Sequence, residues 1–244
     1  MPSRSELVTS AIGDGEAVWE SRLRALVADD PAADSAHDVH HLDRVWANAR
    51  TILAAPEHEG RADRLVVLAA AYLHDCVAVP KDSPDRPRAS RMAADRATGL
   101  LRGIGFPADR LDAVAHAIAA HSYSAGIRPE TLEAKIIQDA DRLDAVGAIG
   151  LARTIAVGAE LGRPLFHPTD PAARHRPVDE VAWSADHLLE KIVKLPARMN
   201  TAAGRTLAER RIRIVHDFLS GLAEETGSLA VELRSIPQDE ATSI

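Results

Sequence analysis

Cysteine and aromatic residues are scarce in this sequence, and long hydrophobic runs are missing. The 244 residues include one cysteine, Cys76, so no internal disulfide can form, which fits a reducing cytoplasmic compartment. Aromatic residues make up 3% of the chain, whereas alanine, leucine and arginine abound, a balance that favours helices over a β-sandwich. No apolar run approaches the roughly 20 residues of a transmembrane helix, and the N-terminus lacks a signal-peptide-like apolar segment. We therefore expect a cytoplasmic protein without membrane contact.

The composition is that of an ordinary globular protein, 46% hydrophobic and 27% charged. A net charge of −7 argues against general nucleic-acid binding, although a local basic pocket for phosphate remains compatible with it. No linker or repeat divides the chain. We therefore predict one all-α domain over residues 1–226, a helical bundle of about nine to ten helices, followed by a flexible tail at 227–244. We expect a monomer or a homodimer.

Apolar residues recur at helical spacing along most of the chain. The segments predicted to be helical are 16–28, 38–55, 61–78, 89–102, 107–121, 129–144, 146–160, 178–195 and 204–224. Three prolines in residues 79–88 predict a loop, and four more make 162–177 a long polar connection.

Polar residues with metal-binding chemistry interrupt this apolar pattern at four places. The first is His74-Asp75, which follows the apolar run Leu68–Leu73. Neighbouring helical side chains point about 100° apart, and a divalent ion can draw an imidazole and a carboxylate to one point. Such an ion also offsets the cost of burying the aspartate. The alternative is a polar helix end that faces water.

The other three places show similar residue types. His37, His40 and His41 lie near one face at the start of a predicted helix, and His41 leads directly into the apolar stripe. His116 and His121 are five residues apart, so they do not obviously bind one ion together. The acids in segment 139–144 include two that lie close to the apolar face of a helix and need a counter-charge. A solvated acidic helix end is the alternative there.

With these four segments in this order, the chain resembles the HD-domain superfamily of metal-dependent phosphohydrolases, whose pattern is H…HD…D. The similarity is greatest to a small cytosolic branch and covers residues 35–218. The motifs that carry it are Ala36–Val45, Leu73-His74-Asp75, Lys81–Pro84, Ala120–Ser124 and Asp139–Gly150. His41 keeps the H-x-x-RV register of the family, so we assign the metal role to His41 and leave His40 without a role.

The resemblance implies an all-α fold in which His41, His74, Asp75 and Asp141 bind a divalent cation. These ligands suit Mn, Fe, Ni, Co, Mg or Zn and do not choose among them. A metal-activated water would then attack a phosphate or phosphoanhydride of a small phosphorylated substrate, with a (deoxy)nucleotide as the first candidate.

The resemblance also implies roles for residues around the ion. We predict that Lys81, Asp82 and His121 take part in catalysis. Substrate-binding candidates are His37, Ser83, Arg88, Ser90 and Asp144. Two alternatives stay open: a di-iron oxygenase acting on a small organophosphonate, in which His116 and His121 could serve a second ion, and a non-catalytic nucleotide or metal sensor.

Overall fold

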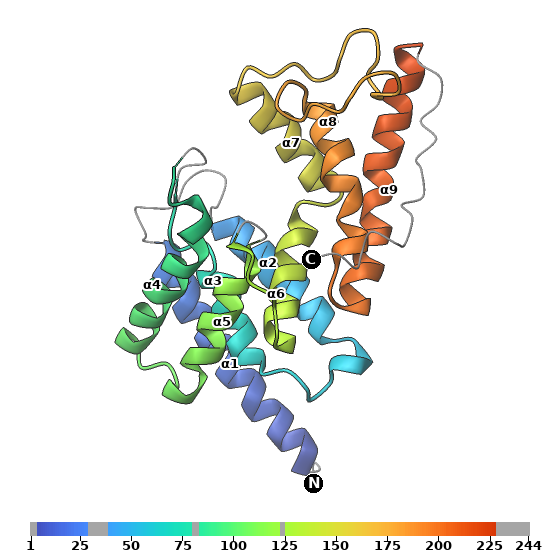
Figure 1. The fold of residues 1–244 in the computed structure, drawn as a ribbon. Coiled ribbons are helices and arrows are strands. Elements are labelled where there is room, and N and C mark those ends of the chain that lie inside the picture. Colours follow the sequence, from blue (N-terminus) through green and yellow to red (C-terminus); the bar gives the residue numbers. More distant parts are fainter. Residues whose placement is uncertain (1–3, 29–38, 80–82, 123–124, 228–244) are drawn as a thin grey trace. The chain divides into compact units, whose positions relative to one another are not determined.

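The computed structural model describes residues 4–28, 39–79, 83–122 and 125–227, with the side chains of the first helix described from residue 15 onward (Figure 1). Helices and the connections between them make up these ranges, and no β-strand occurs within them, which confirms the all-α prediction. The chain forms two compact units, here called the N-terminal unit (Met1–Asp141) and the C-terminal unit (Arg142–Ile244). The single domain over residues 1–226 stays a prediction, and residues 228–244 lie outside the described ranges.

The N-terminal unit is built around one buried helix. Its helices are α1 (Arg4–Ala28), α2 (Val39–Leu53), α3 (Arg64–Leu73), α4 (Ala89–Gly103), α5 (Leu111–His121) and most of α6 (Leu132–Asp144). Every residue of α3 from Val66 to Leu73 is buried, and the helix packs against α1, α2 and α5. A helix that is apolar on all sides needs such neighbours. Asp63 caps it by accepting hydrogen bonds from two backbone amides, those of Leu65 and Val66.

The predicted helix over 61–78 is wrong at its C-terminal end, because α3 stops at Leu73. His74 is the C-terminal cap, and its ring Nδ1 lies 3.0 Å from the carbonyl oxygen of Ala71. The side chain therefore takes up a carbonyl that a continuing helix would have bonded. The His74-Asp75 pair consequently lies on the turn after the helix, where neighbouring side chains are not held to helical directions.

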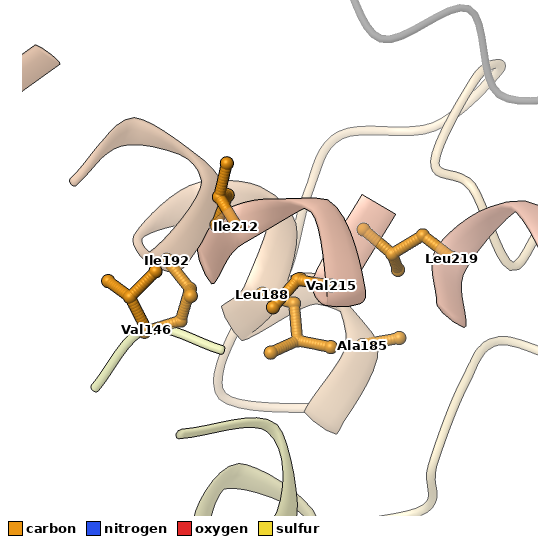
Figure 2. Close-up of a cluster of buried hydrophobic side chains, with 7 residues drawn as sticks. All are labelled: Val146, Ala185, Leu188, Ile192, Ile212, Val215 and Leu219. Carbon is orange, nitrogen blue, oxygen red and sulfur yellow. The ribbon is translucent and has the colours of Figure 1, made fainter. Parts of the chain in front are cut away.

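The C-terminal unit packs three helices around its own core. These are α7 (Ala148–Glu160), α8 (Ser184–Glu190) and α9 (Ala202–Glu225). Figure 2 shows the buried side chains at its centre, Val146, Ala185, Leu188, Ile192, Ile212, Val215 and Leu219. The helix predicted over 178–195 is therefore too long. The helix begins only at Ser184, because the Asp179 carboxylate accepts the amides of Val181 and Ala182 in a turn before it, and short 3₁₀ turns follow its end at Glu190.

The long connection between α7 and α8 is held by one buried ion pair. The Arg176 guanidinium donates through both terminal nitrogens to Asp186, with Nη2 at 2.7 Å from Oδ1. Asp186 is fully buried and also accepts the amide of Asp179. This pairing satisfies a carboxylate that would be costly to bury alone. Among the described residues, no helix has both the length and the apolar character required to cross a membrane.

Two glycines in helices should respond oppositely to alanine. A Cβ at Gly150 in α7 would lie 2.0 Å from the carbonyl oxygen of Ala145, whereas Gly99 on the exposed side of α4 has open space around it. We expect Gly150→Ala to destabilise the protein by about 1–3 kcal/mol. Gly99→Ala should stabilise it by about 0.5–1 kcal/mol through helix propensity. Urea unfolding followed by circular dichroism measures both, and equal effects would contradict the close approach at Gly150.

Candidate metal centre

Four side-chain donor atoms converge inside the N-terminal unit. The Nε2 atoms of His41 and His74 lie 3.4 Å apart. The His41 Nε2 is 3.9 Å from Asp75 Oδ2 and 3.6 Å from Asp141 Oδ1. The His74 Nε2 is 3.5 Å and 3.8 Å from the same two oxygens. The four residues predicted as ligands therefore lie around one point.

Three different elements deliver these groups. His41 stands in the first turn of α2, on the buried face that continues with Leu42 and Val45. His74 and Asp75 follow the end of α3, and Asp141 lies near the end of α6. The imidazoles are almost fully buried, while the two carboxylates keep 26% and 30% of their side-chain surface exposed. The site is thus enclosed on the imidazole side and open on the carboxylate side.

Backbone carbonyls fix the orientation of two imidazoles. The Nδ1 atoms of His74 and His121 lie 3.0 Å and 2.7 Å from the carbonyl oxygens of Ala71 and Ile118. A proton on Nδ1 can be donated to each carbonyl. In a neutral His74 ring this leaves the Nε2 lone pair for an ion, whereas His121 bonds to Asp75 when its Nε2 also carries a proton. Metal-binding histidines commonly hold their second nitrogen in this way.

His121 extends the cluster beyond the four predicted ligands. Its Nε2 lies 3.4 Å from Asp75 Oδ1, the oxygen that does not face His41 and His74. Its ring packs edge-on against the ring of His74, with centroids 4.9 Å apart. Asp75 therefore bridges two parts of the site through its two oxygens.

Burial and charge move the histidine pKa values in opposite directions. Burial lowers the pKa of His74 below its ordinary value, and the nearby carboxylates offset this only in part. Burial also acts to lower the pKa of His121, but its hydrogen bond to Asp75 and the charges of Asp75 and Asp141 together raise it. A neutral His74 suits metal binding, whereas His121 is the imidazole that holds a proton more readily.

The donor set fits a divalent cation. Two groups of three residues have ligand atoms within 4.8 Å of one another, namely His41, His74 and Asp141, and His74, Asp75 and His121. Tetrahedral ligands at about 2.1 Å from an ion stand about 3.4 Å apart, close to the separations seen here. Imidazole nitrogen and carboxylate oxygen together suit first-row transition metals and Mg. Two acids and two imidazoles gathered at a buried point have the composition that such an ion requires.

Several predicted substrate contacts have partners within the fold. Ser90 is buried and its hydroxyl donates to the carbonyl of Ala119, 2.9 Å away. Asp144 is buried in the C-terminal unit, where Arg153 donates to it at 2.8 Å. The burial of Asp144 and Asp139 contradicts the alternative of a solvated acidic helix end.

The remaining candidates divide into exposed and undescribed residues. Ser83 accepts the amide of Asp85, and the largely exposed Arg88 lies 3.3 Å from the Asp85 carboxylate. His116 is apart from the cluster, since its Nε2 accepts the amide of Glu130. The predicted residues His37, Lys81 and Asp82 lie outside the described ranges. The functional roles of all these residues stay predictions.

Sequence reasoning missed the amides that border the cluster. Asn48 and Gln138 are buried, and each donates to a backbone carbonyl beside a residue of the site. Their distance in sequence from the predicted ligands could have indicated a place beside the site. Asn48 follows His41 by seven residues and Gln138 precedes Asp141 by three, so each shares a helix face with its ligand.

Comparisons with known proteins show which family the chain resembles. The family model of the HD domain matches residues 39–146, which contain all five residues of the cluster. The uncharacterized protein YpgQ of Bacillus subtilis is 30% identical over 202 residues, 81% of this chain and 88% of YpgQ. An HD-superfamily hydrolase from Bacillus thuringiensis is 31% identical, with a TM-score of 0.66 over 87% of this chain and 98% of that one. The crystal structure of YpgQ in complex with ADP also has a TM-score of 0.66, with 28% identity over 86% and 96% of the two chains.

Two adjacent histidines give a matched test of the metal centre. We expect Mn²⁺ or Co²⁺ at about 100 times its dissociation constant to stabilise the wild-type protein by about 2.7 kcal/mol. His41→Ala should lose this stabilisation because it removes an inward donor. His40→Ala should keep it, since His40 is exposed. Thermal unfolding with and without the ion measures the effect, and equal behaviour of the two variants would contradict the assignment.

Proposed function

The chain belongs to the HD-domain family, and from that premise we propose that it is a metal-dependent phosphohydrolase acting on a small phosphorylated metabolite. The observation that carries the proposal is the convergence of two imidazole nitrogens and two carboxylate oxygens within 3.4–3.9 Å of their neighbours. Solved structures similar to this chain include proteins described as HD-superfamily hydrolases, which supports hydrolysis as the reaction class.

In this proposal the residues of the cluster have separate tasks. His41, His74, Asp75 and Asp141 hold the divalent cation. When bound, such an ion lowers the pKa of a coordinated water and withdraws charge from phosphoryl oxygens. The raised pKa of His121 and its place beside Asp75 Oδ1 suit it to deliver a proton to the leaving oxygen.

A nucleotide is the first candidate for the substrate. The YpgQ structure contains ADP, and that chain matches 86% of this one. A polyphosphate needs cationic or hydrogen-bonding groups near the ion, and the segment from Lys81 to Arg88 can supply them. We assign Ser83 and Arg88 to phosphate binding and the Lys81-Asp82 pair to proton transfer as parts of the same proposal.

One observation favours a second candidate, a di-iron oxygenase acting on an organophosphonate. His74, Asp75 and His121 form a second group of possible ligands, in which the outer oxygen of Asp75 and the Nε2 atom of His121 are not needed by the first group. His116, the other histidine considered for a second ion, bonds to Glu130 away from the cluster. Turnover without oxygen supports hydrolysis, whereas strict oxygen dependence with two irons per chain supports the oxygenase.

The test of hydrolysis is a substrate screen with a ligand variant. The purified protein is incubated with nucleoside mono-, di- and triphosphates and other phosphorylated metabolites, each with Mn, Co, Mg, Ni, Fe or Zn, and released phosphate and pyrophosphate are measured. On the best substrate, Asp75→Ala should lower turnover by at least about a thousandfold, because it removes metal binding worth several kcal/mol in the transition state.

The matched control is an exposed aspartate of the same unit. Asp95 lies on the solvent side of α4, so Asp95→Ala should keep wild-type turnover. Circular dichroism must show that both variants remain helical. Full activity of a folded Asp75→Ala protein would refute the hydrolase assignment, and a wild-type protein that binds an ion but releases nothing from the panel would favour the sensor alternative.

A further inference from the structure

We propose that Asn48 and Gln138 are positioning residues, whose carboxamides hold the segment of α6 that carries Asp141 in register with His41 and His121. The inference rests on the proposed function, since it concerns the same metal centre. It adds two residues that are not among the proposed ligands of the ion and that act on these ligands through the backbone.

Asn48 connects α2 to α6. It lies two helical turns after His41, so its side chain leaves the same face of α2. It is 6% exposed, and its Nδ2 donates to the carbonyl oxygen of Ala140 at 3.0 Å. Ala140 directly precedes Asp141. The hydrogen bond therefore fixes the helix that bears His41 against the peptide that leads into Asp141.

Gln138 connects α6 to the end of α5. It lies one turn before Asp141, is 5% exposed, and donates through Nε2 to the carbonyl oxygen of Ala120 at 2.7 Å. Ala120 directly precedes His121, the last residue of α5. Carbonyls in the last turn of a helix have no partner within it, so Gln138 takes up a group that would otherwise be costly to bury.

Two neighbouring carbonyls at the end of α5 are bonded in the same way. Ile118 is paired with His121 Nδ1, and Ala119 accepts the hydroxyl of Ser90 from α4. Three successive carbonyls thus have side-chain partners, one of them from α6. The end of α5 is held from two sides, and so is the direction in which His121 points.

Together with two further contacts, these hydrogen bonds close a ring through the helices of the site. Tyr72 in α3 donates to Asp43 in α2 at 2.9 Å, and Arg96 in α4 donates to the carbonyl of Cys76 at 2.7 Å. With Ser90, Gln138 and Asn48, the ring runs from α2 through α3, α4, α5 and α6 back to α2. In each contact, at least one of the two bonded residues lies within two positions of a cluster residue in the sequence.

Hydrogen bonds between helices fix their relative position along the helix axis, which apolar packing alone does not. Hydrophobic burial is non-directional and tolerates small sliding of one helix along another. A metal site tolerates displacements of only about 0.5 Å, so its ligands need a supporting shell with defined geometry. Asn48 and Gln138 are the two ring members that brace α6, whose only donor in the cluster is Asp141.

The test removes each donor while keeping the shape of the side chain. Asn48→Leu and Gln138→Met are made in the full chain, and Co²⁺ affinity and the visible absorption of bound Co²⁺ are measured. We expect about tenfold weaker binding, as for other outer-shell partners of metal ligands, with a changed Co²⁺ spectrum. Ile136→Val is the matched control, because Ile136 is buried on α6 and its side chain has no hydrogen bond to lose. This variant should bind Co²⁺ with wild-type affinity and spectrum, even if the lost methyl group lowers its melting temperature.

Two results would contradict the inference. Wild-type affinity and spectrum in folded Asn48→Leu and Gln138→Met proteins would overturn this inference alone. A wild-type protein that fails to bind Co²⁺ and every other tested ion would overturn the proposed function together with it. If the apolar variants do not fold, Asn48→Ser and Gln138→Asn, which stay polar but reach less far, undergo the same measurement with the same expectation.

Discussion

The contact between the His41 and His74 imidazoles is the constraint on which the N-terminal unit depends. Their Nε2 atoms are 3.4 Å apart, both rings are almost fully buried, and two carboxylates face them. Burial of so many polar atoms at one point is unfavourable unless they share a proton or a cation. The surrounding helices must therefore supply enough apolar burial to offset this cost. The segment Val66–Leu73 of α3, buried throughout, does so directly beside the cluster.

The ends of two helices fix the orientation of histidines in the cluster. Both α3 and α5 finish at a histidine of the cluster, and in each case the ring Nδ1 bonds a carbonyl three residues earlier. One hydrogen bond thereby completes the helix and aims Nε2 at the carboxylates. A histidine in mid-helix could not do both, since the carbonyl would already accept a backbone amide.

The sequence predicted the helical class and the convergence of His41, His74, Asp75 and Asp141, because apolar spacing and the HD motifs are local signals. It did not predict that α3 ends before His74, since the deciding bond is made by the histidine itself. The shortened α8 was missed for a similar reason, because Asp179 forms a competing turn. The place of His121 beside Asp75 depends on contacts between α3 and α5 that no local pattern encodes.

The abundance of alanine links the composition to the site. The carbonyls that accept side-chain hydrogen bonds around the cluster belong largely to alanines, namely Ala71, Ala93, Ala119, Ala120 and Ala140. A methyl side chain lets a neighbouring helix approach until its short polar groups reach the backbone, whereas a larger residue would cover the carbonyl and separate the helices. Ala93, Ala120 and Ala140 are almost fully buried, so enlarging any of them would displace a neighbour.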